Sequence, residues 1–232
     1  MAKRPVFLST DQPPYFREEP VEFTFYSGFA VSQKQKSVKS LHKAFLDLHP
    51  QKRVLEISGA SEDDLGASLS AFQLGVTLTD GRNCTVETVF QSSKVFEHGG
   101  PYRDLLNKSS REAKKDPRLK ESGQLIAFDA MGHRFPLTPR TYFYNWLYIN
   151  ALHRHSELTE PLMEYAAFTD IAFNPERSLN CQARAAAIYV ALRRNGALES
   201  ALSDAESFLR VVYGQNESNM TDSVKEQLSF WA

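Results

Sequence analysis

Residues 85–96 have the sequence TVETVFQSSKVF, and this stretch carries the most informative pattern in the chain. Glu87, Gln91 and Lys94 are spaced at i, i+4 and i+7, so a helix over 85–96 would place them on one face. Valine and phenylalanine fill most of the other positions, which predicts a short helix that is largely buried. A buried carboxylate and ammonium are costly to desolvate unless they are paired or used. This face is therefore a candidate site, and a solvent-exposed ion pair is the competing interpretation.

The composition excludes some classes of protein. The chain has 232 residues, enough for one sizeable domain or two small ones. Its 27 Lys and Arg balance 28 Asp and Glu to a net charge of −1, which argues against non-specific binding to long nucleic acid. A single base or nucleotide in a pocket remains compatible with this charge.

Sequence features also bear on compartment and cofactors. Cys84 and Cys181 are not part of a CxxC motif or a Cys/His cluster, so we expect free thiols in a reducing compartment. The start, MAKRPVFLST, lacks the apolar core of a secretory signal, and the longest apolar run (185–192) is too short to cross a bilayer. There is no GxGxxG or P-loop motif. We therefore predict a cytoplasmic protein without a metal, a cofactor or a membrane partner; the oligomeric state stays open.

The order of predicted elements indicates an α+β protein. Predicted strands come early, over residues 21–25, 53–58 and 74–79, and the turn dipeptide Asp80-Gly81 follows the third. Predicted helices cover 36–49, 85–96, 140–153, 180–194 and 197–212. Strands followed by a mainly helical second half fit one domain in which the early strands pack under the helices.

Several helix starts are predicted from capping patterns. Thr85 is the expected N-cap of the helix over 85–96, and Ser109 with Glu112 has the spacing of a capping box. Glu112 is therefore more easily explained as structural than as catalytic. Thr138-Pro139 and Thr159-Glu160-Pro161 are the predicted starts of two later helices.

Two segments in the middle of the chain carry a recognisable pattern: LSAF at 69–72 and the form T-x-E-x-x-x-Q-x-x-K-x-F at 85–96. The first is similar to an LSNF-type segment and the second to the hallmark helix of the NADAR superfamily of N-glycosidases, which the middle of the chain therefore resembles. The similarity covers roughly residues 54–195. The chain departs from the family at Ala71, where Asn is usual, at Thr88, where His is common, and at Phe173-Asn174, which replaces Trp-Gly.

A narrower resemblance extends over the whole chain. RPVFL, GFAVSQKQKSV, HGGPYRDLL and FTDIAFNP are similar to segments of the NADAR antitoxins associated with DarT toxins. The resemblance implies a single NADAR-like domain of the α+β class. On that basis residues 1–53 are an N-terminal extension integrated into the domain, 54–212 the NADAR-like core, and 213–232 a C-terminal tail.

The resemblance also implies a function. A DarT toxin attaches ADP-ribose to a DNA base, and its NADAR partner hydrolyses that N-glycosidic bond. We therefore expect an antitoxin that acts on ADP-ribosylated DNA or a modified nucleotide, with guanine as the expected base and a DarT-like toxin encoded nearby. Two alternatives stay open: an N-glycosidase of phosphorylated riboflavin-pathway intermediates, and a non-catalytic protein that binds ADP-ribose or the toxin.

Three residues are candidates for catalysis. Cleavage of an N-glycosidic bond builds positive charge at the anomeric carbon; a carboxylate at Glu87 would stabilise this charge or activate the attacking water, and a structural ion pair is the alternative. Lys94 would neutralise a phosphate, tune Glu87, or attack the opened sugar as an amine; a simple salt bridge is the alternative. Asp170 would hold the ribose hydroxyls or assist water, or it is an ordinary turn residue.

Further residues are candidates for substrate binding. Gln91 would hydrogen-bond a sugar hydroxyl, and Trp146 would stack on adenine or on the modified base, although most of its aromatic run is expected to be core. Lys-rich segments would meet a pyrophosphate or the DNA backbone. The predicted binding residues are Ser70, Phe72, Gln91, Trp146, Asn174, Asn180, Gln33, Lys34 and Lys36, with Arg111, Lys114 and Lys115 as a second group for phosphate.

Overall fold

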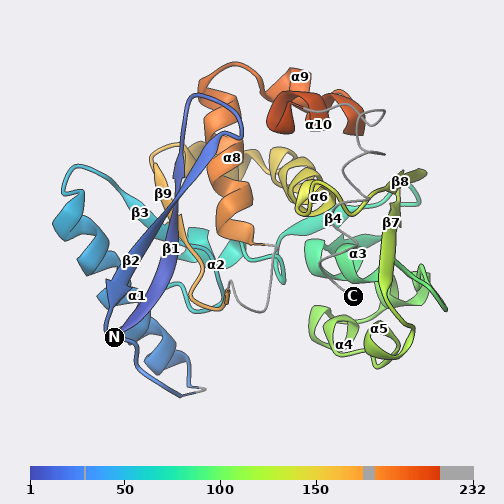
Figure 1. Cartoon of the computed structure of the whole chain (residues 1–232), viewed down its shortest axis with the longest axis horizontal. Coiled ribbons are helices and arrows are strands. Elements are labelled where there is room, and N and C mark those ends of the chain that lie inside the picture. The colour runs from blue at the N-terminus through green and yellow to red at the C-terminus, as the bar shows by residue number, and fades with distance from the viewer. Residues whose placement is uncertain (29, 175–180, 215–232) are drawn as a thin grey trace.

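The computed structural model describes residues 1–28, 30–174 and 181–214 (Figure 1). Its largest sheet has the strand order β2-β1-β9-β3. These strands are β1 (Ala2–Ser9), β2 (Phe16–Phe23), β9 (Ala167–Thr169) and β3 (Val54–Glu56). β1 is antiparallel to β2 and β9, whereas β3 and β9 are parallel and so end at the same edge of the sheet.

Alternating side chains give this sheet two buried faces. In β1, Val6 and Leu8 pack into a cluster with α1 (Val31–Leu48), whereas Phe7 packs into the main core with α8 (Gln182–Arg194). Successive side chains of a strand point to opposite faces, so an apolar run such as VFL serves both. The sheet thus lies between α1 and α8 (Figure 1).

The second half of the chain is mainly helical and packs on an aromatic cluster. α3 (Val86–Ser92) lies against α6 (Tyr142–His153), and a small sheet of β6 (Lys94–Phe96), β7 (Leu125–Ala130) and β8 (His133–Phe135) packs beside them. Phe90 lies 5.3 Å from Phe128 and 6.1 Å from Phe143, measured between ring centroids. Such aromatic contacts add to the burial of apolar area in fixing how α3 sits on the core.

The remaining elements connect these two parts of a single domain. They are α2 (Asp64–Ser68), β4 (Gly75–Thr77), β5 (Asn83–Thr85), the 3-10 helix η1 (Arg103–Asn107), α4 (Ser110–Lys114), α5 (Arg118–Glu121), α7 (Ser156–Leu162), α9 (Leu198–Leu202) and α10 (Ala205–Tyr213). Among the described residues, none of the helices combines the length and the hydropathy needed to cross a bilayer. The predicted α+β class, with early strands and later helices, is confirmed.

The predicted helix over 85–96 is wrong at its C-terminal end. α3 stops at Ser92, and Lys94 is the first residue of β6, which pairs with β7. The hydroxyls of Ser92 and Ser93 both donate to the carbonyl oxygen of Val89, at 3.0 and 2.6 Å. Serine side chains that bond the backbone in this way compete with helix continuation. Glu87 and Gln91 therefore share a helix face, but Lys94 does not belong to it.

Other helix boundaries also differ from the predictions. α6 begins at Tyr142 with Thr141 as N-cap, not at Thr138-Pro139. α7 begins at Ser156, so Pro161 lies inside it rather than at its start. The predicted helix over 197–212 is two helices, because Asp204 breaks the run and caps α10 by accepting a hydrogen bond from the backbone N–H of Ser207 at 2.7 Å. The caps predicted at Thr85 and Ser109 are confirmed.

Candidate functional site

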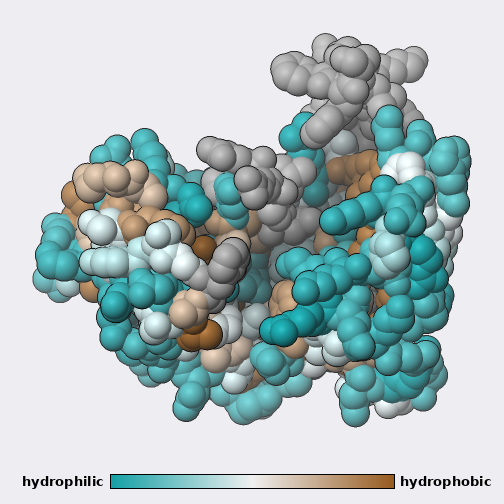
Figure 2. Space-filling model, turned by 90° about the horizontal axis from the view of Figure 1, so that it is seen from below, coloured by the Kyte–Doolittle hydropathy of each residue, from teal (hydrophilic) through white to brown (hydrophobic). Residues whose placement is uncertain are grey.

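The candidate site lies where the large sheet meets the helical half. The parallel strands β3 and β9 end together near α2 (Figure 1), and hydrogen bonds through Ala71 connect this edge with the first turns of α3 and α8. The side chain of Gln182 joins these parts: its Oε1 accepts from the N–H of Ala71 at 2.7 Å, and its Nε2 donates to the carbonyl of Ile57 at 2.5 Å. Figure 2 shows this face of the molecule hollowed between the part that carries α1 and the part that carries α3, α4 and α5.

Glu87 is held in the first turn of α3 and is only 5 % exposed. Its backbone N–H donates to the carbonyl of Ala71 at 2.9 Å, which ties the helix start to the segment 69–72. The Glu87 carboxylate accepts from Gln91 Nε2 at 2.9 Å and lies 3.7 Å from Lys114 Nζ. A buried carboxylate with an amide and a surface ammonium as its described partners keeps lone pairs available for a ligand.

Gln91 is also directed toward this site. Its Nε2 donates to Glu87, but its Oε1 is buried and has no hydrogen-bond partner among the described residues. Buried polar atoms are normally satisfied, so an orphaned acceptor beside a buried acid marks a place for a donor such as a sugar hydroxyl or a water molecule.

Lys94 returns to the same cluster although it lies on a strand. Its Nζ is 5.0 Å from the ring centroid of Phe90, on the next turn of α3 from Glu87. Burial lowers the pKa of the Lys94 ammonium to about 8; Glu87 opposes this change and Lys114 adds to it. A lysine with such a pKa has an appreciable neutral fraction near neutral pH, which an amine nucleophile requires.

α4 brings a second lysine over the site. Ser110 Oγ donates to the carbonyl of Phe72 at 3.2 Å and lies 2.8 Å from Thr85 Oγ1, so the start of α4 is bound to both segments that frame Glu87. At its other end, Lys114 Nζ lies 4.9 Å from the ring centroid of Phe72. The Lys114 side chain is about half exposed, which leaves its charge accessible to an anion from solvent.

Asp170 follows β9 directly, and the charge of Lys114 acts on it as well. Its Oδ1 accepts from the N–H groups of Ala172 and Phe173 at 3.0 and 3.1 Å. Burial and the neighbouring Glu56 carboxyl raise the pKa of Asp170 to about 8, against the opposing effect of those two amides and of Lys114. The raised pKa favours the protonated form of Asp170 near neutral pH.

The three predicted catalytic residues thus share one electrostatic neighbourhood. Lys94 feels the charge of Glu87, and Lys114 acts on both Lys94 and Asp170. A carboxylate, an amine of lowered pKa and a protonated carboxyl provide a base or charge stabiliser, a nucleophile and an acid. Displaced pKa values that cluster in this way are typical of catalytic sites.

The sequence as a whole matches one known family. Residues 2–222 fit the family model of the DarT1-associated NADAR antitoxin. The chain belongs to the DarT1-associated NADAR antitoxin family. The resemblance found in the sequence is confirmed by this match, and it points to a DarT toxin as the partner of this NADAR chain. No protein among curated sequences matches the chain significantly.

The structure of this NADAR chain separates the predicted binding residues. Ser70 is buried and Phe72 is half-buried beside Lys114, so both lie next to the Glu87 cluster. Trp146 packs against Phe135 with ring centroids 5.0 Å apart, in the aromatic core. Asn174 lies in the connection after Asp170, and Asn180 lies outside the described residues.

The predicted basic contacts lie on another element. Gln33, Lys34 and Lys36 are in the first two turns of α1, where both lysines are exposed. Within the described residues, no hydrogen bond or ion pair joins this part of α1 to Glu87. Their contact with a phosphate or with DNA stays a prediction.

Sequence reasoning missed two polar residues that shape this NADAR site. Gln182 connects three segments, as described above, and Glu56 is a carboxyl only 2 % exposed at the end of β3. A signal for Glu56 was present, because an acid inside the apolar strand RVLEIS must be paired or neutral when buried. Gln182 had no such signal, since its partners are backbone groups distant in sequence.

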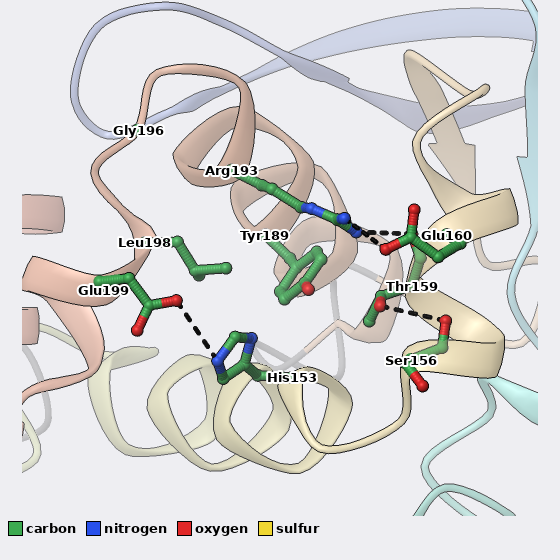
Figure 3. A pocket seen from close by; sticks show the side chains of 9 residues that line it. All are labelled: His153, Ser156, Thr159, Glu160, Tyr189, Arg193, Gly196, Leu198 and Glu199. Atoms are coloured by element: carbon green, nitrogen blue, oxygen red, sulfur yellow. Dashed lines mark hydrogen bonds and ion pairs between the residues drawn. The ribbon is translucent and has the colours of Figure 1, made fainter.

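A separate pocket of about 350 Å³ lies between α6, α7, α8 and α9 (Figure 3). Arg193 pairs with Glu160 there, and His153 lies 3.6 Å from Glu199 across the same hollow. Its charged groups are thus matched with one another, in contrast to the orphaned acceptor beside Glu87. The Glu87 cluster therefore stays the candidate site, and this pocket is separate from it.

The raised pKa of Asp170 predicts a specific pH dependence of stability. Folded Asp170 keeps its proton up to about pH 8, whereas the unfolded residue loses it near its ordinary value of 3.8. The stabilisation from this group is therefore present at low pH and is lost as the pH rises toward 8. Between pH 5 and pH 8.5 the wild type should lose about 4 kcal/mol of unfolding free energy in urea titrations, beyond any change in Asp170→Asn, which lacks the group. Equal pH dependence of the two proteins would contradict the assignment.

Proposed function

We propose that the protein is an N-glycosidase that removes ADP-ribose from a nucleobase, with guanine in DNA as the substrate, and so reverses the action of a DarT-type toxin. The arrangement around Glu87 carries this proposal. A 5 %-exposed carboxylate, an orphaned amide oxygen on Gln91 and a lysine of lowered pKa lie together, next to a half-buried aromatic ring. Membership of the DarT1-associated antitoxin family supports the choice of substrate over the other known NADAR chemistry.

In the proposed reaction the bond between the base nitrogen and the anomeric carbon breaks. Protonated Asp170 gives its proton to the departing base, whose nitrogen retains the bonding electrons. The Glu87 carboxylate stabilises the positive charge that develops on the sugar and takes a proton from the attacking water, whose oxygen bonds to the anomeric carbon. The products are ADP-ribose and the unmodified base, whose nitrogen carries the proton from Asp170. Proton exchange with solvent then returns Asp170 to its protonated form and Glu87 to its carboxylate form.

Lys94 offers a second form of the same reaction. Its neutral amine would attack the anomeric carbon in place of water, forming a carbon–nitrogen bond as the base departs. Opening of the sugar ring then gives an imine, which water hydrolyses to ADP-ribose and the free amine. Reduction with borohydride during turnover distinguishes the two forms, because only the imine leaves ADP-ribose permanently attached to Lys94, as peptide mass spectrometry would show.

The direct test uses an oligonucleotide carrying a single ADP-ribosylated guanine. Release of ADP-ribose and recovery of the unmodified oligonucleotide, followed by mass spectrometry, are expected. Turnover of phosphorylated riboflavin-pathway intermediates instead would identify the other NADAR chemistry. Stoichiometric binding of ADP-ribose without product release, measured by calorimetry, would identify a non-catalytic binding protein.

Lys114 is expected to bind the diphosphate of the substrate. Its exposed ammonium lies over Phe72 and 3.7 Å from the Glu87 carboxylate, so it sits at the side of the site that solvent anions reach. Lys114→Met should raise KM about tenfold at low ionic strength and change kcat far less, because a phosphate contact made equally in ground and transition states affects binding.

Lys120→Met is the matched control for Lys114→Met. Lys120 is an exposed lysine on α5 with no described contact to the Glu87 cluster, so its loss changes the net charge equally. An equal rise of KM in both variants would show a general charge effect instead of a phosphate contact.

A further inference from the structure

Glu56 makes an unusual set of contacts on both sides of Asp170. Its Oε2 accepts from Thr169 Oγ1 at 2.6 Å, and its Oε1 accepts from the backbone N–H of Ile171 at 2.9 Å. Ser58 Oγ donates to the same Oε1 at 2.6 Å. One buried carboxyl group therefore binds the residue before Asp170 and the residue after it.

His42 on α1 contacts Glu56 indirectly, through the hydroxyl of Thr169. His42 Nε2 lies 2.8 Å from Thr169 Oγ1. The Thr169 hydroxyl has one proton, which it donates to Glu56, so it must accept from an Nε2–H of His42. Burial lowers the pKa of His42 to about 4, which keeps the imidazole neutral. His42, Thr169 and Glu56 thus form a directed chain from α1 to the carboxyl end of β3.

We propose that Glu56 is a positioning residue for the reaction: it holds Asp170 in the site through both neighbours in the chain, and His42 orients it through Thr169. The role of Glu56 depends on the proposed role of Asp170 as the acid that protonates the departing base. The geometry favours this role because Glu56 binds residues 169 and 171 and not the Asp170 carboxyl itself, whose hydrogen bonds within the described part of the chain come from two backbone N–H groups.

Electrostatics gives Glu56 a second effect on Asp170. The pKa of both carboxyls is raised, first by burial, and the charge of Glu56 raises that of Asp170 further. Glu56 accepts three hydrogen bonds and Asp170 accepts two, so the surroundings favour the negative charge on Glu56 over Asp170.

Other ionisable groups face this pair from every element packed on it. Lys114 on α4 acts on Asp170, and the phenols of Tyr144 and Tyr148 on α6 and the thiol of Cys181 before α8 feel its charge. On the other side, Glu56 and His42 line a pocket of about 170 Å³. The ionisable groups of that pocket besides these two are Lys39, Glu62 and Asp63.

The decisive variant is Glu56→Gln, which keeps the shape of the side chain and removes its charge. The alkaline limb of kcat is expected to move about one pH unit lower, with KM within about twofold of wild type, because Asp170 loses its proton more easily. A purely structural role would lower the amount of folded enzyme without moving the pH profile. A folded Glu56→Gln variant with unchanged kcat and pH profile would overturn the proposal.

Thr169→Val tests the positioning role of Glu56 independently, in case Glu56→Gln does not fold. The substitution keeps the volume of the side chain at position 169 and the charge of Glu56. It removes the hydrogen bond from Thr169 to Glu56 and the one between His42 and Thr169. We expect kcat to fall about tenfold while KM and the alkaline limb stay near wild type, since only the position of Asp170 changes. Activity equal to wild type would contradict the positioning role.

A readout without substrate separates this inference from the proposed function. The titration of the Asp170 side-chain carboxyl carbon can be followed by NMR in wild type and Glu56→Gln, with Asp170→Asn to assign the signal. The pKa of Asp170 should fall by about one unit or more in Glu56→Gln. A lowered pKa in a protein that does not release ADP-ribose would refute the proposed function alone, and an unchanged pKa would refute the coupling of Glu56 to Asp170.

Discussion

Glu87→Gln is expected to slow the release of ADP-ribose from modified DNA by about 1,000-fold, the largest effect of any single substitution in this chain. The amide keeps the shape and the hydrogen bond with Gln91 but cannot stabilise positive charge on the sugar or take a proton from water. Because Glu87 is buried in the first turn of α3 and is not part of the apolar core, the fold should be retained. Single-turnover assays with a singly modified oligonucleotide give the rate of the chemical step.

Two measurements decide whether this loss is chemical. Affinity for ADP-ribose, determined by calorimetry, should change less than about tenfold, because the carboxylate acts mainly on the transition state. Glu22→Gln, which removes an exposed carboxylate from β2, should keep full activity. Wild-type rates in Glu87→Gln would remove Glu87 from the mechanism and would leave the protein with a binding role at most.

Lys94→Met is expected to cost about 100-fold in kcat, the second largest effect. Methionine retains a long apolar stem against Phe90 but has neither a charge nor a nucleophilic nitrogen. If Lys94 attacks the sugar, the wild-type rate should rise with pH up to about 8 as the amine loses its proton, whereas a charge partner would make the rate fall over the same range; either dependence should be absent from the variant. The pH dependence of kcat in single-turnover assays measures both effects.

Lys94→Arg separates the two roles that remain open for this residue. Arginine keeps a positive charge beside Glu87 but stays protonated at all accessible pH values, so it cannot attack the sugar. Activity well above that of Lys94→Met would indicate a charge partner, whereas equal loss together with borohydride trapping in the wild type would indicate a nucleophile. Activity within about threefold of wild type in Lys94→Met would exclude both roles, since a charge or a nucleophile contributes more than that.

Much of the fold could be predicted from local patterns. The alternation in β1 and the apolar spacing of α1 and α8 reflect burial against a sheet, which sequence periodicity reports directly. The caps at Thr85 and Ser109 are hydrogen bonds within four residues, so they too are visible in the sequence. The end of α3 was not, because Lys94 pairs with Phe128 in β7, more than thirty residues later.

The candidate site also combines contacts that local sequence patterns predict with contacts between segments distant in the chain. Glu87 and Gln91 are neighbours on one helix turn, and their spacing alone predicted a shared face. Lys94 joins them through the strand that replaces the end of the predicted helix, and Lys114 joins them because Ser110 binds Phe72 and Thr85. Asp170 and Glu56 meet since β3 and β9 are parallel neighbours, although over a hundred residues separate them.

By itself the sequence determined the family and the α+β class and singled out Glu87 as a candidate, because each of these depends on residue types at short spacing in the chain. Only the tertiary structure decided that the pKa of Asp170 is raised, that the pKa of Lys94 is lowered and that Glu56 binds the residues on both sides of Asp170. These properties arise from desolvation and from charges brought together by packing. The free energy of a charge depends on its surroundings, and those surroundings exist only once the chain has folded.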